Sequence, residues 1–261
     1  MALPAPLRKG VLSRFAAAVG ADCSEAEKPL GEYASLLDFF TRRLKPGLRP
    51  QAPPVVGGIN SPVDGDLIAS GRIEDGALIQ AKGLPYQLGE LLGEDPLAGR
   101  FAGGHFATLY LSPKDYHRIH VPCEGLCRSV ARIEGELWPV NAASTAHTPR
   151  LYVRNRRSTW IAEGTGSDEG LWIGAVLVAA THVGGAVIDG RWLGGRTLPA
   201  HGRLDVNGLQ TWPGDDLGTF ELGSTVVLLI GGEKASCWAL TRGHGLVRVG
   251  ERLGAIACAI S

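Results

Sequence analysis

Four residues of this chain have side chains that together could activate a serine hydroxyl. Ser224 follows Gly223 and precedes a run of apolar residues, while His117, His120 and Asp64 lie upstream. A serine hydroxyl is a weak nucleophile until a neighbouring base takes its proton, and a carboxylate commonly orients that base. These residue types therefore indicate acyl chemistry at Ser224, with a histidine as base and Asp64 as the orienting carboxylate.

Each of these residues also has an ordinary structural explanation. Asp64 stands between Pro62 and Gly65 and could simply cap its own turn. Either histidine could be a hydrogen-bonded residue of the core or surface. No Gly-x-Ser-x-Gly string occurs in the chain, so the nucleophile elbow of many serine hydrolases is absent.

The spacing of the two histidines sets a condition on the local structure. His117 and His120 are three positions apart, so on a regular strand they would face opposite ways. A shared site then requires a bulge or a strand end, and Pro122 favours a strand end here.

The elements that must position these residues are mostly strands. The 37 glycines and 16 prolines indicate frequent turns, which favour short strands over long helices. We expect an α+β fold that is mainly β, with an antiparallel or mixed sheet as its core and amphipathic helices at the N-terminus. The segments expected to be strands are 66–69, 77–80, 106–111, 117–121, 150–153, 159–162, 172–178, 203–206, 225–230 and 245–249, with a further strand toward the C-terminus within 243–261.

Residues 1–50 form a different region from residues 51–261. Apolar residues recur at helical spacing around residues 11–19 and 31–44, and Pro46 ends the second predicted helix. Residues 51–54 resemble a hinge. Eight basic residues stand against five acidic ones, so the helices could either pack onto the core or lie on an anionic membrane surface.

Composition excludes several classes of protein. Lysine plus arginine equals aspartate plus glutamate, 26 of each, so no nucleic-acid partner is expected. Five scattered cysteines without a secretory signal indicate reduced thiols, and Cys123 and Cys127 have no second ligand pair, so no metal site is expected. The apolar stretch 171–188 contains glycines and a histidine, which favours two buried strands over a transmembrane helix.

The motifs around the four residues resemble those of the phosphatidylserine decarboxylase family, over roughly residues 30–235. The resemblance is greatest in Ser61-Pro62-Val63-Asp64-Gly65, Tyr116-His117-Arg118-Ile119-His120-Val121-Pro122 and Leu222-Gly223-Ser224-Thr225. It extends to the segments 39–50, 80–83, 91–93, 103–110 and 135–141.

The resemblance implies a self-processing enzyme. Ser224 would attack the carbonyl of Gly223, and the chain would divide into a large chain, 1–223, and a small chain, 224–261, whose Ser224 becomes a covalent pyruvoyl cofactor. Asp64 and His120 would serve this cleavage. The pyruvoyl group would form a Schiff base with phosphatidylserine, and His117 would act in the decarboxylation that gives phosphatidylethanolamine and CO2.

The resemblance also implies partners and a location. Residues 1–50 would be a membrane-associating segment that holds a homodimeric enzyme peripherally on the cytoplasmic side of the cell membrane, where the lipid substrate lies. A soluble amino-acid substrate is one alternative, which the amphipathic residues 8–44 disfavour. A binding protein that never processes itself is another, and an intact chain lacking a reactive carbonyl would reveal it.

Two segments depart from the family pattern. Arg156 stands where a glutamate is expected, and residues 179–184 differ from the usual glycine-rich string. Trp138 replaces a phenylalanine. These departures leave the cleavage motif intact but put local contacts to the substrate or within the sheet in doubt.

Overall fold

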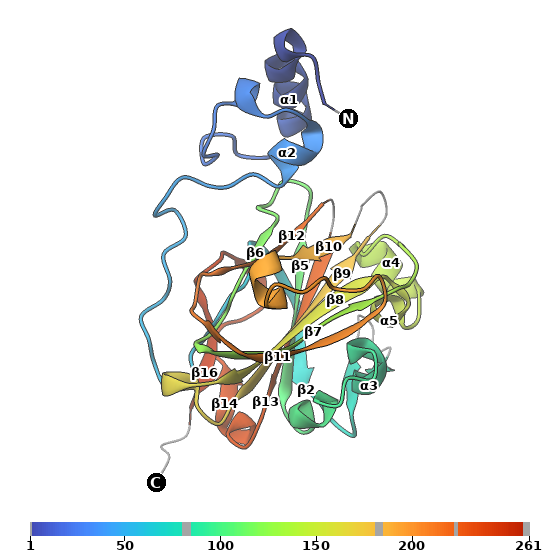
Figure 1. Ribbon diagram of the computed structural model, residues 1–261, viewed down its shortest axis with the longest axis vertical. Helices are drawn as coiled ribbons and strands as arrows, with labels where there is room; N and C mark the ends of the chain where they lie inside the picture. The colour runs from blue at the N-terminus through green and yellow to red at the C-terminus, as the bar shows by residue number, and fades with distance from the viewer. Residues whose placement is uncertain (1, 80–84, 181–184, 222–223, 258–261) are drawn as a thin grey trace.

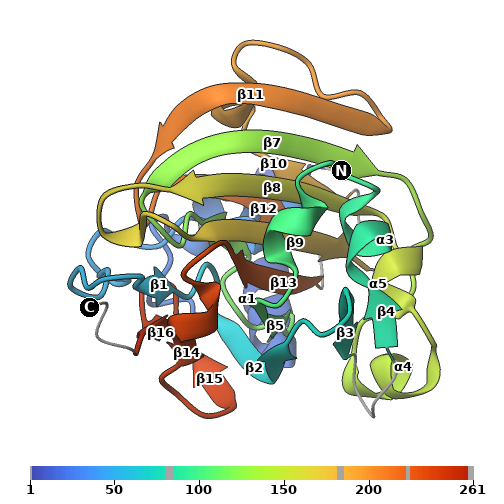
Figure 2. The ribbon, with the colours of Figure 1, turned by 90° about the horizontal axis from the view of Figure 1, so that it is seen from below.

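An antiparallel sheet of eight strands organises the molecule. The computed structural model describes residues 2–79, 85–180, 185–221 and 224–257. The order of the large sheet is β11-β7-β8-β9-β13-β5-β2-β15, and Figure 2 shows its strands curving side by side. Its strands are β2 (Gly65–Arg72), β5 (His105–Leu111), β7 (Gly125–Ile133), β8 (Arg157–Gly164), β9 (Trp172–Ala179), β11 (Gly202–Thr211), β13 (Ser224–Gly231) and β15 (Gly245–Val247).

Three smaller sheets accompany it. One has the order β1-β16-β14, with β1 (Ile59–Asn60), β14 (Trp238–Leu240) and β16 (Arg252–Ile256). The second has the order β10-β12-β6, with β6 (Arg118–His120), β10 (Ala186–Ile188) and β12 (Asp216–Phe220). The third pairs β3 (Ala77–Ile79) with β4 (Pro85–Gln87).

Short helices fill the connections. The α-helices are α1 (Ala5–Val19), α2 (Leu36–Phe40), α3 (Leu88–Leu92), α4 (Ala142–His147) and α5 (Leu151–Arg154). The 3₁₀ turns are η1 (Leu30–Glu32), η3 (Ala98–Phe101), η4 (Gly166–Asp168), η5 (Gly190–Leu193) and η6 (Ala235–Cys237). The fold is therefore mainly β with helices at its N-terminus, as the sequence predicts. Within the described ranges, no helix has the length and apolar character needed to cross a membrane.

The large sheet buries both of its faces. Along β13, Val226, Leu228 and Ile230 belong to one hydrophobic cluster, while Val227 and Leu229 belong to another on the opposite face. The first cluster includes Ile119 of β6 and therefore lies between the large sheet and the β10-β12-β6 sheet. Because both faces are covered, β13 is an uninterrupted apolar strand rather than an alternating one.

The N-terminal helices form a separate layer at one end of the β body. Figure 1 shows α1 and α2 there, near β6 and β12, with the following segment running along the body toward β16. The helices have their own small core, which includes Leu12, Tyr33 and Phe39. The predicted hinge at 51–54 is hydrogen bonded to the body, since the Ala52 amide donates to the Gly250 carbonyl at 2.8 Å.

The predicted second helix is shorter than its apolar pattern indicates. It begins only at Leu36, because the Ser35 hydroxyl caps it by accepting the Asp38 amide at 3.0 Å. The expected apolar face over 31–44 is also wrong in part, since Leu36 and Leu37 are 41% and 43% exposed while Phe40 is buried.

The predicted strand at 150–153 is wrong, because α5 occupies Leu151–Arg154. Arg150 adopts a left-handed conformation with φ of 58° directly before this helical turn. Leu151 and Tyr152 are both buried, although they are adjacent. An apolar run this short does not distinguish a strand from a helical turn.

Candidate active site

Ser224 begins the central strand of the large sheet. It pairs with Leu111 of β5 on one side and with Ala179 of β9 on the other. Its side chain is fully buried, and its hydroxyl lacks a hydrogen-bond partner among the described residues. A buried hydroxyl without a partner is costly to leave unsatisfied, which is a common sign of a reactive position.

The direction of the Ser224 side chain follows from the alternation of β13. Ser224 has the same parity as Val226 and Leu228, so it points toward the layer between the large sheet and the β10-β12-β6 sheet. His117 directly precedes β6 of this second sheet, and its carbonyl accepts the Phe220 amide at 2.9 Å. Its ring bonds the carbonyl of Ser112, which follows Leu111, the residue paired with Ser224, so His117 lies near the end of β5 at which β13 begins.

The ring of His117 is completely buried and has one nitrogen free. Nε2 donates to the Ser112 carbonyl at 3.0 Å, so Nδ1 carries the lone pair, and Nδ1 has no partner in the described part of the chain. Phe40 of α2 stacks on the ring with centroids 3.9 Å apart. Burial lowers the pKa of His117 from 6.5 to about 3, so the imidazole is neutral at pH 7.

His120 at the end of β6 is held by two different partners. Nδ1 donates to the Gly214 carbonyl at 2.8 Å, and Nε2 accepts from the Tyr116 hydroxyl at 3.0 Å. The carboxylate of Asp216 is 3.9 Å from Nδ1. Burial lowers the pKa of His120, while the Gly214 carbonyl and Asp216 act in the opposite direction.

Asp64 pairs with an arginine from the N-terminal region. Nε of Arg49 donates to both carboxylate oxygens at 2.9 Å, and Nη2 donates to Oδ2 at 2.5 Å. The same guanidinium bonds Glu25, with Nη2 2.6 Å from Oε2. Asp64 also accepts the Val249 amide at 2.8 Å, so a buried network fixes its position.

The glycine after Asp64 has a packing role. A side chain at Gly65 would place its Cβ 2.3 Å from the Tyr110 carbonyl oxygen, so the backbones of β2 and β5 can approach only without it. This contact holds the Asp64 turn against the strand that pairs with Ser224.

The structure brings some of the predicted site residues together and separates others. The Asp64 turn lies beside β6, since the His120 amide donates to the Pro62 carbonyl at 2.8 Å. Within the described ranges, however, no hydrogen bond or ion pair joins the Asp64 carboxylate to His120; Arg49 is the partner of Asp64 instead. The expected strand end is present, because β6 covers only Arg118–His120. Gly223 lies outside the described residues.

Sequence reasoning missed four residues that contact the candidate catalytic groups. Tyr116 and Asp216 flank His120, Phe40 covers His117, and Arg49 binds Asp64. Phe40 and Arg49 both belong to the segment 39–50, whose match to the family pattern was the available signal. Nothing in the local sequence distinguishes Asp216 as a neighbour of His120.

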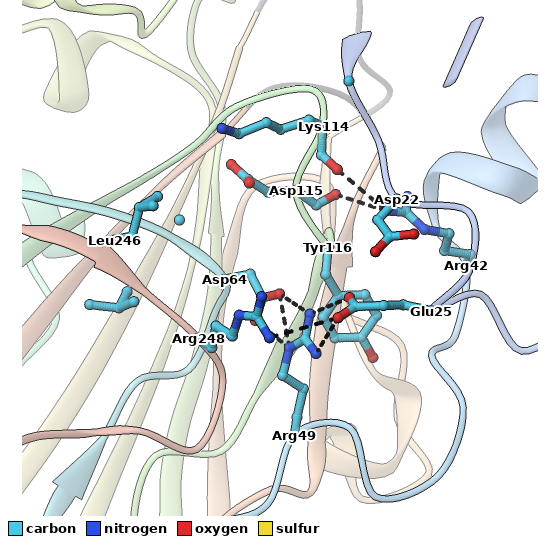
Figure 3. A pocket seen from close by; sticks show the side chains of 13 residues that line it. Asp22, Glu25, Arg42, Arg49, Asp64, Lys114, Asp115, Tyr116, Leu246 and Arg248 are labelled. Atoms are coloured by element: carbon cyan, nitrogen blue, oxygen red, sulfur yellow. Dashed lines mark hydrogen bonds and ion pairs between the residues drawn. The ribbon is translucent and has the colours of Figure 1, made fainter. Parts of the chain in front are cut away.

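Two cavities open beside these residues. One, of about 230 Å³, lies between the N-terminal region and the Asp64 turn, as Figure 3 shows. The other, of about 270 Å³, is lined by His120, Arg43 and Lys45. Arg49 and Tyr116 line both and so stand between them. Within the described ranges, no three His, Cys, Asp or Glu side chains are grouped as a metal site requires.

The departures from the family pattern have local explanations. Arg156 forms a partly exposed ion pair with Glu134, with Nη2 2.9 Å from Oε2. Trp138 is 44% exposed and lies under the Arg154 guanidinium. Ala179 pairs with Ser224 in the sheet, whereas residues 181–184 lie outside the described ranges.

The comparisons with known proteins all identify the same family. Residues 36–255 match the family model described as phosphatidylserine decarboxylase. The chain is 41% identical over 264 residues to the phosphatidylserine decarboxylase proenzyme of Anaeromyxobacter sp. (strain K), covering 97% of this chain and 89% of that protein. It is 37% identical over 267 residues to the proenzyme of the same name from Myxococcus xanthus (strain DK1622), with the same coverage. The proenzyme of Delftia acidovorans (strain DSM 14801 / SPH-1) is 42% identical over 232 residues, covering 85% of this chain and 78% of that protein.

Proposed function

The chain belongs to the phosphatidylserine decarboxylase family, and on that premise we propose that it converts phosphatidylserine to phosphatidylethanolamine and CO2 with a pyruvoyl group made from its own Ser224. The observation that carries this proposal is the buried, unpartnered hydroxyl of Ser224 at the first position of β13. Most buried hydroxyls in folded proteins have a hydrogen-bond partner, so an unpartnered one directly after the proposed cleavage position calls for an explanation. The unpartnered hydroxyl of Ser224 is consistent with a serine that is converted to another group during processing.

The first reaction is cleavage of the chain by itself. The Ser224 oxygen attacks the carbonyl carbon of Gly223, and the peptide bond becomes an ester. Loss of the α-proton of Ser224 then expels the Gly223 carboxylate, which ends the large chain, 1–223. Addition of water and loss of ammonia leave the pyruvoyl group at the N-terminus of the small chain, 224–261.

Two histidines divide the proton transfers in this proposal. His120, held by Tyr116 and Gly214, serves the cleavage, with Asp64 in support. His117 serves the decarboxylation: its Nδ1 has no partner among the described residues, and its Nε2 donates to the carbonyl of Ser112, which follows the residue paired with Ser224. The pyruvoyl carbonyl supplies an electron-withdrawing centre when it binds the substrate amine. Because His117 is buried, water is excluded from the site of the proton transfer that it would carry out.

The N-terminal region gives the proposed enzyme access to its lipid. Leu7, Val11, Leu36 and Leu37 are all exposed on this region, although all four are large and apolar. Basic residues outnumber acidic ones in 1–50, which favours an anionic surface. These features support a peripheral position on the cytoplasmic face of the membrane, and the family resemblance suggests a homodimer of paired large and small chains.

Intact-mass spectrometry under denaturing conditions tests the proposal directly. Purified protein should give two chains that separate between Gly223 and Ser224, and a carbonyl-reactive reagent should add its mass to the smaller one. Release of CO2 from phosphatidylserine vesicles, but not from free serine, should accompany this. A single unreactive chain in freshly folded wild-type protein would refute the proposal.

A further inference from the structure

The cavity beside Asp64 contains an imbalance in how its charges are paired. Four of its lining residues are basic and four are acidic, namely Arg42, Arg49, Lys114 and Arg248 against Asp22, Glu25, Asp64 and Asp115. Figure 3 shows these side chains around the space between the N-terminal region and the body. The formal charges of these eight side chains cancel, but the acidic side chains are better provided with hydrogen-bond partners than the basic ones.

The acidic groups already have partners. Asp64 and Glu25 both bind Arg49. Asp115 accepts the Ser112 amide at 2.7 Å, and Asp22 accepts the Ser24 amide at 2.8 Å. No carboxylate of this cavity therefore lacks a donor.

Arg42 is the basic group without an anion. Its side chain is buried, with only 4% of the residue exposed, and its Nε has no partner among the described residues. Nη2 makes only long contacts, 3.4 Å to the Lys114 carbonyl and 3.5 Å to the Asp115 carbonyl. In the part of the chain that the structure describes, no carboxylate lies within ion-pair distance of Arg42, whose guanidinium stacks on the Phe39 ring at 4.9 Å.

Lys114, at the rim of the same cavity, is a second basic residue without an ion pair among the described residues. It is exposed, and its ammonium group forms no hydrogen bond or ion pair with the described residues. The peptide carbonyls that Arg42 contacts are those of Lys114 and Asp115, whereas Figure 3 shows the Lys114 side chain extending from there to the other side of the cavity, away from Arg42.

A buried cation without an ion pair is expensive, because burial removes its hydration, and here two long hydrogen bonds and an aromatic ring replace only part of it. Burial lowers the pKa of Arg42, yet a guanidinium stays charged near neutrality. Such a site is completed by an anionic ligand. A phosphodiester suits it, since a guanidinium donates two N–H groups to phosphate oxygens.

We propose that Arg42 binds the phosphodiester of a serine-bearing lipid headgroup in this cavity. The inference rests on the proposed function for the identity of the lipid. The carboxylate of the headgroup is a poorer candidate for Arg42, because an ion pair that stabilises the departing carboxylate in the ground state opposes its loss as CO2. The cavity lies beside a candidate catalytic group, since Tyr116, which lines it, donates to Nε2 of His120 at 3.0 Å.

A binding experiment tests the site without requiring self-cleavage. In the single-chain Ser224→Ala background, calorimetry with glycerophosphoserine as the probe should show binding that Arg42→Gln weakens roughly tenfold to a hundredfold and that Arg42→Lys partly retains. Arg100→Gln is the matched control, because Arg100 also stacks on an aromatic ring at 4.9 Å, in this case Trp172 of β9. It should leave the affinity unchanged.

Two further probes distinguish the sources of the anion. Inorganic phosphate should bind much more weakly than glycerophosphoserine, and free serine should show no loss on Arg42→Gln. Equal affinity for inorganic phosphate would overturn the assignment to a lipid headgroup. Equal affinity of the Arg42→Gln and parent proteins for glycerophosphoserine would overturn the site itself.

A kinetic experiment then uses the wild-type background. Arg42→Gln should still divide into two chains but should raise KM for phosphatidylserine by a similar factor, with a smaller effect on kcat. A fall in kcat at unchanged KM would contradict a binding role. If wild-type protein fails to divide, the proposed function fails, whereas the calorimetric experiment still decides the role of Arg42.

Discussion

The phenyl ring of Phe40 lies against the imidazole of His117, with ring centroids 3.9 Å apart and ring planes 25° from parallel. Phe40 ends α2 in the N-terminal region, whereas His117 directly precedes β6 of the body. A residue of the proposed membrane-associating segment therefore covers a candidate catalytic histidine. The segment therefore contributes to the environment of the candidate active site.

Replacing Phe40 should change how His117 titrates. Phe40→Ala removes a ring that excludes water, so the pKa of His117 should rise from about 3 toward its ordinary value of 6.5. Nuclear magnetic resonance of the imidazole in the Ser224→Ala background measures this. The cost in stability should be about 3 to 5 kcal/mol.

Leu12→Ala is the control for that experiment. Leu12 is fully buried in the core of the same N-terminal region, so its truncation should also destabilise the protein, by about 2 to 5 kcal/mol. It should leave the titration of His117 unaltered. An equal shift in both variants would mean that loosening the region, rather than the Phe40 ring, controls the histidine.

Removing Arg49 should destabilise the protein through Asp64. Arg49→Met leaves a largely buried carboxylate without its ion pair, which costs about 3 to 5 kcal/mol. Adding Asp64→Asn should recover part of this loss, and urea unfolding of the single and double variants measures the coupling. Arg154→Met breaks an exposed pair with Glu136 and should cost no more than about 1 kcal/mol. Strict additivity of the Arg49 and Asp64 changes would show that the pair is not coupled.

Changes at the reactive residues should separate cleavage from decarboxylation. Ser224→Ala should give a folded, inactive single chain. His120→Ala and Asp64→Ala should slow the appearance of the two chains, the latter less if Asp64 mainly orients other groups. His117→Ala should still divide but should release CO2 poorly. Gel analysis of cleavage alongside a CO2 assay measures both, and a His117→Ala protein that stays intact would reverse the assigned roles.

Acidification should destabilise the protein through its buried histidines. Burial lowers the folded-state pKa of both His117 and His120, so the unfolded chain binds more protons once the pH falls below about 6.5. Their stabilising contribution is complete above that pH and is lost on acidification, for His117 until the pH approaches about 3. The free energy of unfolding should fall by up to about 1.4 kcal/mol per histidine for each pH unit.

The check is urea unfolding between pH 7.5 and 5 in the Ser224→Ala background. His117→Gln should reduce the pH dependence and leave the part due to His120, whereas His147→Gln, at an exposed position ending α4, should preserve it in full. An undiminished dependence in His117→Gln would assign the effect to groups other than His117.

The sequence by itself determined the elements whose pattern is local. The apolar run after Ser224 predicted β13, and the run at 172–178 predicted β9, because fully buried strands need continuous apolar residues. Pro122 correctly indicated a strand end near the histidines. The motifs also identified Asp64, His117, His120 and Ser224 as candidates, whose catalytic roles stay predictions.

Only the tertiary structure decided how these residues are paired. Arg49 reaches Asp64, Phe40 reaches His117 and Asp216 reaches His120 through the packing of the N-terminal region and the β10-β12-β6 sheet on the large sheet. Such contacts join segments distant in the chain, and neither periodicity nor spacing encodes which side chain will meet which charge. The short length of α2 and the helical form of α5 were also beyond the pattern, because capping at Ser35 and burial of adjacent residues override a brief apolar repeat.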